Sequence, residues 1–168
     1  MKDLYDISGI VVAIDPGWSG AMAVFKNGRL ETTCKCMPTT TETWTECKEY
    51  LRVANVAVLE WVHSMPGQGV ASTFKFGYNY GMWNGFLATV PLQTILVPPK
   101  MWQSTWDNVP KDKKDRKNFL KQMAMEIAVE SRSGVKVTLQ NSDAICIGEW
   151  FIEKGKGEDK WLPKRNLT

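Results

Sequence analysis

The chain has 168 residues, of which 43% are hydrophobic and 23% are charged. This ordinary globular composition excludes a wholly disordered or collagen-like protein. The 21 basic and 18 acidic residues leave a net charge of only +3, so total charge alone does not indicate a nucleic-acid partner. There is a single histidine, His63, which disfavours poly-histidine metal sites. We therefore expect any catalysis to depend on carboxylates, cysteines or lysines.

The length and the cysteines set the expected organisation. A chain of 168 residues fits a single domain, which we expect to occupy residues 1–154 and to be followed by a polar tail over 155–168. The N-terminal segment lacks the apolar stretch of a secretion signal, and the four cysteines form no Cys-x-x-Cys pair, so reduced thiols and a cytoplasmic location are expected. No stretch approaches 18 apolar residues, so no membrane span is expected.

Three antiparallel strands are predicted at the start of the chain. Residues 9–15 form a continuous apolar run rich in valine and isoleucine, which is typical of a strand buried on both faces. Residues 21–25 and 29–34 are two further runs with Asn27-Gly28 between them. An Asn-Gly pair between two such runs is the strongest short-range signal for a hairpin.

A helix, a strand and a second helix are predicted next. Residues 39–52 combine capping-box spacings with an amphipathic pattern, and residues 56–59 form a short apolar strand. Residues 70–87 form an aromatic helix with three glycines on one face, namely Gly77, Gly81 and Gly85. Because glycine costs a helix about 1 kcal/mol relative to alanine, we expect this face to lie close to another backbone, in the sheet or in a second subunit.

The second half of the chain is predicted to add one strand and two helices. Residues 94–97 form a strand that a Pro-Pro pair ends, and residues 107–117 form a charged connector. Helices are expected over about 118–130 and about 142–154. Together these elements predict an α/β fold with a mixed five-stranded sheet, three antiparallel strands followed by parallel strands, flanked by helices.

Three acids occupy positions where such a fold would gather them. Asp15 ends the first predicted strand, Glu60 ends the fourth, and Asp143 lies in the first turn of the last helix. If the first and fourth strands are parallel neighbours, their terminal acids emerge at the same edge of the sheet. A Mg²⁺ ion would relieve the repulsion between them, since it prefers oxygen ligands and takes one or two carboxylates plus substrate phosphate. A two-metal version would activate a water on one side and stabilise the leaving oxygen on the other.

Each acid also has an ordinary structural explanation. An aspartate before Pro-Gly commonly forms a turn, and an aspartate in the first turn of a helix complements the helix dipole. Glu60 alone would serve equally as a surface residue. The ordered combination of the three acids, rather than any one of them, favours a metal site.

The segments around these acids resemble a known family. They read AIDPGWSGA at residues 13–21, LEWVHSMPGQG at 59–69, STFKFGYNYG at 72–81 and SDAICIGEW at 142–150. These motifs resemble those of the RuvC family of Holliday junction resolvases, particularly its shorter phage-type members, over nearly all of residues 8–154. The resemblance implies an RNase H-like nuclease domain, a homodimer in the bacterial cytoplasm, and Mg²⁺-dependent nicking of four-way junctions and other branched DNA such as forks and flaps. Mn²⁺ is expected to replace Mg²⁺.

Carried over by position, the resemblance assigns Asp15, Glu60 and Asp143 as metal ligands. Family members generally have a fourth acid about one helical turn before the last of these, where this chain has Gln140. Gln140 would still offer a carbonyl oxygen to the metal, but the lost charge would weaken metal affinity. Natural variation, an alternative ligand and a chain altered to be inactive all remain open explanations.

A basic segment is the first candidate for contacting DNA. Between positions 111 and 121 there are two acidic and six basic residues, which gives a local net charge of +4. The basic residues are Lys111, Lys113, Lys114, Arg116, Lys117 and Lys121. Such clusters contact phosphates, although alone they fit a solvated helix face equally well. The resemblance places DNA contacts in this segment, with Lys114 and Lys117 as the best matches, and we expect one of them to stabilise the transition-state phosphate.

The segment after the fourth strand is the second candidate. Backbone amides at a helix N-terminus can hold a phosphate, with Gln68, Ser72 and Thr73 as side-chain donors. Trp61 and Phe74 would be able to stack on unpaired bases at an opened junction. Packing in the core is the commoner fate of such residues, and it is the expectation for both.

Three functions fit these observations. The first is a metal-dependent endonuclease, a hydrolase of phosphodiester bonds that nicks branched DNA. The second is a catalytically weak or inactive protein of the same fold that binds branched DNA, with metal binding impaired at Gln140. The third is a fragment of an actin-like ATPase, which opens with a similar strand and Asp-x-Gly turn but belongs to far longer proteins.

Overall fold

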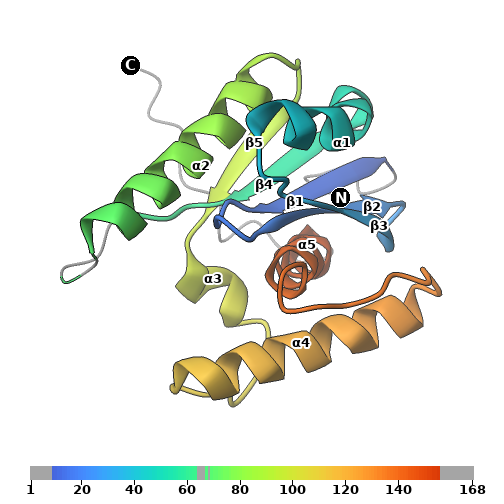
Figure 1. Cartoon of the computed structure of the whole chain (residues 1–168). Helices are drawn as coiled ribbons and strands as arrows, with labels where there is room; N and C mark the ends of the chain where they lie inside the picture. Colours follow the sequence, from blue (N-terminus) through green and yellow to red (C-terminus); the bar gives the residue numbers. More distant parts are fainter. Residues whose placement is uncertain (1–8, 64–66, 68, 156–168) are drawn as a thin grey trace, which may run out of the picture.

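The computed structural model describes residues 9–63, 67 and 69–155 (Figure 1). Its strands are β1 (Ile10–Asp15), β2 (Ala21–Lys26), β3 (Arg29–Lys35), β4 (Val56–Glu60) and β5 (Gln93–Val97). Its helices are α1 (Thr40–Val53), α2 (Val70–Ala88), α3 (Pro99–Gln103), α4 (Lys113–Glu130) and α5 (Ser142–Gly155). Apart from Gly155, which ends α5, the predicted polar tail lies outside the described residues.

The strands form one mixed sheet in the order β3-β2-β1-β4-β5. β1 pairs antiparallel with β2, and β2 pairs antiparallel with β3. β1 and β4 are parallel, as are β4 and β5. The predicted hairpin is present, because Asn27 and Gly28 take φ values of 51° and 75° at the turn between β2 and β3. The predicted mixed five-stranded sheet is therefore confirmed.

Alternating residues of β1 contribute to two separate cores. Val11 and Ala13 pack with α3, α4 and α5, whereas Val12 and Ile14 pack with α1 and α2. This alternation follows from the two-residue period of a strand. Figure 1 shows the resulting layers, with α1 and α2 on one face of the sheet and α3, α4 and α5 on the other.

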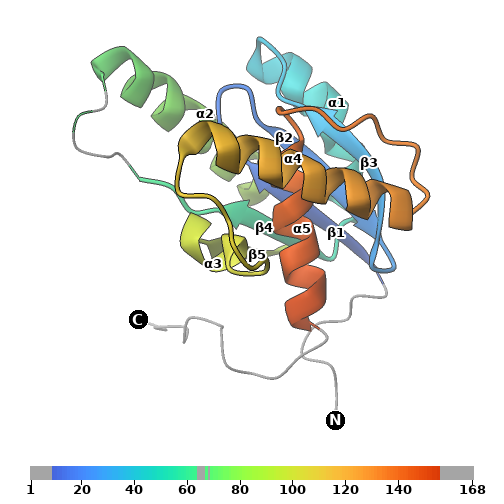
Figure 2. The ribbon, with the colours of Figure 1, turned by 90° about the horizontal axis from the view of Figure 1, so that it is seen from below.

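Helix α5 is the central element of the second layer. Ile145 and Ile147 are fully buried, because α5 lies between the sheet and α4. Figure 2 shows α4 crossing α5 on the side that faces away from the sheet. A Cβ at Gly148 would collide with the ring of Phe25 on β2. The missing side chain therefore lets α5 pack closely against the sheet at this point.

Two predictions for the segment between β5 and α5 are wrong. The helix expected from about residue 118 begins at Lys113, because the Asp112 carboxylate accepts hydrogen bonds from the backbone N–H groups of Lys114 and Asp115. Half of the expected charged connector is therefore helical. The Pro-Pro pair does end β5, but it also starts the unpredicted helix α3, with Pro99 at its first position, where proline is well tolerated.

The glycine face of α2 does not approach the sheet. A Cβ added at Gly77, Gly81 or Gly85 would meet no heavy atom within 4 Å in the described chain. One of the two expected explanations, contact with the sheet, is therefore wrong. Among the described helices, none is both long and apolar enough to cross a membrane.

Candidate active site

The three predicted acids emerge on one side of the sheet. The parallel register pairs Ile14 with Leu59, so the next residues, Asp15 and Glu60, end their strands at the same level. Both continue the set of alternating residues that faces the α5 layer. Ligands commonly bind at the carboxyl ends of parallel strands, and both acids lie there, partly buried.

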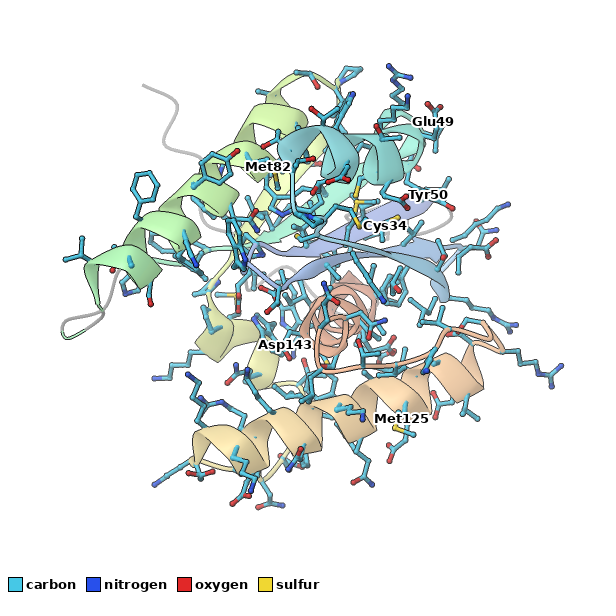
Figure 3. The ribbon with its side chains drawn as sticks, in the orientation of Figure 1. Cys34, Glu49, Tyr50, Met82, Met125 and Asp143 are labelled. Atoms are coloured by element: carbon cyan, nitrogen blue, oxygen red, sulfur yellow. The ribbon has the colours of Figure 1, made fainter. Side chains whose placement is uncertain are left out.

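The start of α5 brings Asp143 to the same place. Asn141, which is 1% exposed, holds this turn in position. Its Oδ1 accepts from the backbone N–H of Thr138 at 2.7 Å, and its Nδ2 donates to Oγ1 of Thr33 on β3 at 3.0 Å. Asp143 lies in the first turn that follows, and Figure 3 shows it between the sheet and α4.

All three carboxyl groups lie in surroundings that disfavour their charge. Burial, followed by the charge of Asp143, raises the pKa of Asp15 to about 7. Burial, followed by the charge of Asp15, raises the pKa of Glu60 to about 8. Burial also raises the pKa of Asp143. The charge of Asp143 contributes to the raised pKa of both Asp15 and Glu60, so the three side chains lie within electrostatic reach of one another, and a bound cation would stabilise their ionised forms.

Two hydrogen bonds orient the strand-end carboxylates. The backbone N–H of Gly17 donates to Oδ1 of Asp15 at 2.8 Å. Nε1 of Trp102, a buried residue of α3, donates to Oε1 of Glu60 at 2.8 Å. Each bond favours the ionised carboxylate and engages one of its oxygens. Sequence reasoning missed Trp102, because α3 was not predicted.

The donor set fits a hard cation that retains part of its water shell. In the part of the chain that the structure describes, no three or more histidine, cysteine, aspartate or glutamate side chains are arranged to hold a metal ion by themselves. Mg²⁺ rarely needs an all-protein site, since it keeps several waters and takes one or two carboxylates together with substrate phosphate. Two carboxylates near Asp15, from Glu60 and Asp143, match this open kind of site.

The predicted fourth position behaves differently. Gln140 points its amide at the loop between β1 and β2, where Nε2 lies 3.4 Å from the carbonyl oxygen of Gly20. A Cβ at Gly20 would collide with the backbone oxygen of Asp15, so this loop is folded tightly against the end of β1. In this structure Gln140 therefore contacts the loop backbone next to the carboxylates.

The basic segment lies beside the acids because it forms the beginning of α4. The charge of Lys117 lowers the pKa of both Asp15 and Asp143, and that of Arg116 lowers the pKa of Asp143. Arg116 also donates from Nη1 to the carbonyl oxygen of Lys111 at 3.1 Å. The other basic residues lie on the surface, with Lys111, Lys113 and Lys114 exposed and Lys121 half-buried.

Aromatic side chains are exposed on the other flank of the site. The expectation that Trp61 and Phe74 pack in the core is wrong, because they are 51% and 74% exposed. Trp18, in the loop after Asp15, is 50% exposed, and Nζ of Lys75 lies 5.5 Å from the centre of its ring. Trp18 and Trp61 lie on the loops that follow Asp15 and Glu60 in the chain, and Phe74 and Lys75 lie in the second turn of α2.

The expected phosphate donors near α2 are only partly described. Ser72 is exposed and Thr73 is half-buried in the first turn of α2. Gly69 caps this helix without a side-chain hydrogen bond. Gln68 lies outside the described residues.

Comparisons with known proteins identify the fold. No protein-family model matches the chain, and no curated protein sequence matches it. The solved structure of Thermus thermophilus RuvC in complex with a Holliday junction substrate matches with a TM-score of 0.58 at 12% identity, covering 88% of this chain and 96% of that one. Another Thermus thermophilus RuvC structure matches with a TM-score of 0.52 at 15% identity, covering 87% and 96%. The chain therefore has the RNase H-like fold of RuvC.

Proposed function

We propose that this protein is a divalent-metal-dependent endonuclease that nicks four-way junctions and other branched DNA. One observation carries the proposal: three partly buried carboxyl groups, from β1, β4 and α5, lie within electrostatic reach of one another next to the cationic start of α4, and burial raises the pKa of each. Carboxylates of this kind suit a magnesium-bound phosphodiester. The adjacent lysine and arginine side chains suit the remaining phosphate charge.

Each residue of the site has a separate proposed role. Asp15, Glu60 and Asp143 would hold Mg²⁺ or Mn²⁺, which supplies an activated water and neutralises charge on the scissile phosphate. Trp102 orients one of these carboxylates through its hydrogen bond. The ammonium group of Lys117 lies where it can stabilise the extra negative charge of the transition state. Hydrolysis then forms a bond from water oxygen to phosphorus and breaks the bond to the leaving oxygen.

Branched rather than plain duplex DNA is the proposed substrate. Part of the support is fold similarity, since one of the similar structures is a RuvC protein bound to a Holliday junction. The other part is the exposure of Trp61, which directly follows Glu60, and of Phe74 near the start of α2. Exposed rings stack on unpaired bases, and such bases occur where strands exchange at a junction.

The proposed active form is a homodimer, because a four-way junction presents two equivalent strands. Helix α2 supplies the contact surface, which comprises Val70, Gly77, Gly81 and Gly85. Val70 is 88% exposed. The three glycines would allow a second backbone to approach closely. The shorter, phage-type form of this family remains part of the proposal.

The alternative is a protein that binds branched DNA without cutting it, and Gln140 is the observation that favours it. The two functions are separated by incubating the protein with a labelled synthetic four-way junction and Mg²⁺ or Mn²⁺. Paired nicks that Asp15→Asn abolishes support the nuclease. Tight binding without nicks, unchanged by Gln140→Asp, supports the inert binder.

A further inference from the structure

A buried side chain of α2 forms hydrogen bonds to the loop between β1 and β2. Helix α2 lies on the face of the sheet opposite to the one that carries the three acids. Asn79 of α2 is 5% exposed. Its Nδ2 donates to the carbonyl oxygen of Pro16 at 3.0 Å and to that of Gly17 at 2.6 Å. The same nitrogen lies 3.7 Å from Sγ of Cys36. Asn79 therefore joins a helix to the two residues that directly follow Asp15.

The contact extends from Asn79 to the carboxylate of Asp15. Gly17 accepts from Asn79 through its carbonyl oxygen and donates from its N–H to Oδ1 of Asp15 at 2.8 Å. The same carbonyl oxygen accepts from the N–H of Gly20 at 2.9 Å, which closes the loop. The carbonyl group of Pro16, which also accepts from Asn79, and the N–H of Gly17 form one peptide group, and this group connects the amide of Asn79 with a proposed metal ligand.

The chemistry of the partners requires a donor at this position. Both of the nearest backbone groups are carbonyl oxygens, so only the NH₂ side of the amide can face them. An aspartate of the same shape would turn an acceptor towards two acceptors. It would remove the donor that the buried carbonyl oxygen of Pro16 accepts from and would leave that of Gly17 with the N–H of Gly20 alone, and losing a donor to a buried acceptor is expensive.

The loop is also held from the other face of the sheet. Gly20 accepts from the backbone N–H of Cys36 at 3.1 Å and from Nε2 of Gln140 at 3.4 Å. Asn79 lies on the α2 side of the sheet and Gln140 on the α5 side. Two amide side chains therefore contact the 16–20 loop from opposite sides. On α2, Lys75 and Trp83 lie one turn before and after Asn79, and Lys75 contacts Trp18 of the same loop.

We infer that Asn79 is a positioning residue for the active site: it fixes the loop whose Gly17 N–H orients the carboxylate of Asp15 for metal binding. The inference rests on the proposed function, because it assigns Asp15 to the metal. Helix α2 would then have two roles, contact with a second subunit and support of the loop after Asp15. A movement of α2 would change the geometry of that loop. Asn79 touches neither the substrate nor the metal.

The test compares the same substitution at two asparagines. Asn79→Asp keeps the shape and removes the donors, and Asn79→Ser keeps one shorter donor. Asn27→Asp is the matched control, because Asn27 is exposed at the turn between β2 and β3, at the end of the sheet opposite Asp15, and Asp-Gly forms the same kind of turn. Each variant is assayed for the Mg²⁺ concentration that gives half-maximal nicking of a four-way junction, and for junction affinity without metal.

We expect Asn79→Asp to raise the Mg²⁺ requirement by about tenfold or more, a typical cost of losing an outer partner of a metal ligand. Asn79→Ser should fall between this variant and the wild type, and Asn27→Asp should match the wild type. Junction affinity without metal should stay within about twofold in every variant, because the phosphate contacts on α4 are intact.

A second readout keeps the inference testable if the protein does not nick DNA. In the metal-free protein, amide hydrogen exchange at Gly17 and Gly20 should accelerate in Asn79→Asp and Asn79→Ser, while amides of β3 keep their wild-type rates. The inference is overturned if both variants match the control in exchange. It is also overturned if all amides accelerate by one common factor, because that pattern shows a general loss of stability. Absence of nicking in the wild type overturns the proposed function alone.

Discussion

Asp15 and Glu60 lower the stability of the folded protein when they ionise, and a bound cation would restore it. Burial comes first among the causes that raise their pKa values to about 7 and about 8, and the neighbouring carboxylates add to it. A fold that only needed stability would have apolar or amide side chains at these strand ends. Retaining acids there is typical of functional sites.

The first prediction concerns the pH dependence of the metal-free protein. These two carboxyl groups hold protons in the folded state that they release in the unfolded chain, where their pKa values are 3.8 and 4.5. Their contribution to folding stability therefore falls as pH rises from about 4 to about 8. Denaturant unfolding at several pH values should show this slope, and added Mg²⁺ should offset the loss at pH 8 by binding the folded state.

Asp15→Asn provides the matched variant for this titration. The amide oxygen still accepts from Gly17, but the side chain no longer ionises. We expect the variant to be more stable than the wild type at pH 8 without metal, by about 1 to 3 kcal/mol, which is discounted because the groups are partly exposed. A variant less stable than the wild type at pH 8, with an unchanged slope, would contradict this view of the site.

The second prediction concerns Trp102, which holds Glu60. Trp102→Phe keeps a buried ring but removes the donor, so the pKa of Glu60 should rise further and metal should bind less well. The Mg²⁺ concentration for half-maximal nicking should increase by about tenfold. Trp150→Phe is the control, because Nε1 of Trp150 is buried without a hydrogen-bond partner among the described residues. Equal effects of the two substitutions would remove Trp102 from the site.

At the scale of elements, helix α4 determines where the basic residues of the chain lie relative to the three acids. It begins at Lys113, so its basic residues occupy successive turns and have different tasks. Lys117 is exposed but lies close enough to the acids to lower the pKa of Asp15 and Asp143, and Arg116 lowers the pKa of Asp143. Lys113 is exposed one turn earlier. The helix thus carries two cations to the proposed reaction centre and others to the surface beside it.

This difference gives the third prediction. Lys117→Ala should lower the nicking rate at saturating DNA by about 10- to 100-fold, because a charge that stabilises the transition state is lost. Lys113→Ala should leave that rate unchanged, weaken binding, and reduce the slope of log affinity against log salt by about one. Single-turnover kinetics and binding measured at several salt concentrations separate the two. Identical behaviour of the variants would show that α4 is an undifferentiated basic surface.

Helix α2 provides the fourth prediction. If its glycine face packs against a second subunit, Gly81→Leu should leave a folded monomer, because the added side chain blocks the close approach of two backbones. Within the described chain a Cβ at this position meets nothing within 4 Å, so the monomer itself should tolerate the change. Light scattering and circular dichroism report mass and folding. A folded variant that remains dimeric would place the interface elsewhere.

At the scale of the whole molecule, local signals predicted the sheet and the acids well. The Asn27-Gly28 turn, the apolar run of β1 and the strand-terminal positions of Asp15 and Glu60 all depend on residues close in sequence. The predicted start of α4 is wrong because the charged first turn of this helix resembles a loop. The aspartate that caps it, Asp112, is the one local signal for the true start.

The contacts that complete the site were beyond sequence reasoning. Trp102 reaches Glu60 across 42 positions, and Asn79 reaches Gly17 across 62. Such pairs depend on how α3 and α2 pack on the sheet, which periodicity does not specify. The exposure of Trp61 and Phe74 was likewise unexpected, because average burial of aromatic residues favours the core.

The central claim is that the Asp15 carboxylate acts in metal-dependent cutting of branched DNA. It is tested most directly by incubating the protein with an end-labelled four-way junction and Mg²⁺ or Mn²⁺, and resolving the strands on a denaturing gel. We expect paired nicks at the junction that require the metal and are abolished by Asp15→Asn. A plain duplex of the same sequence should remain uncut. Tight junction binding without nicks in either metal, unchanged when Gln140→Asp supplies a fourth acid, would contradict the claim.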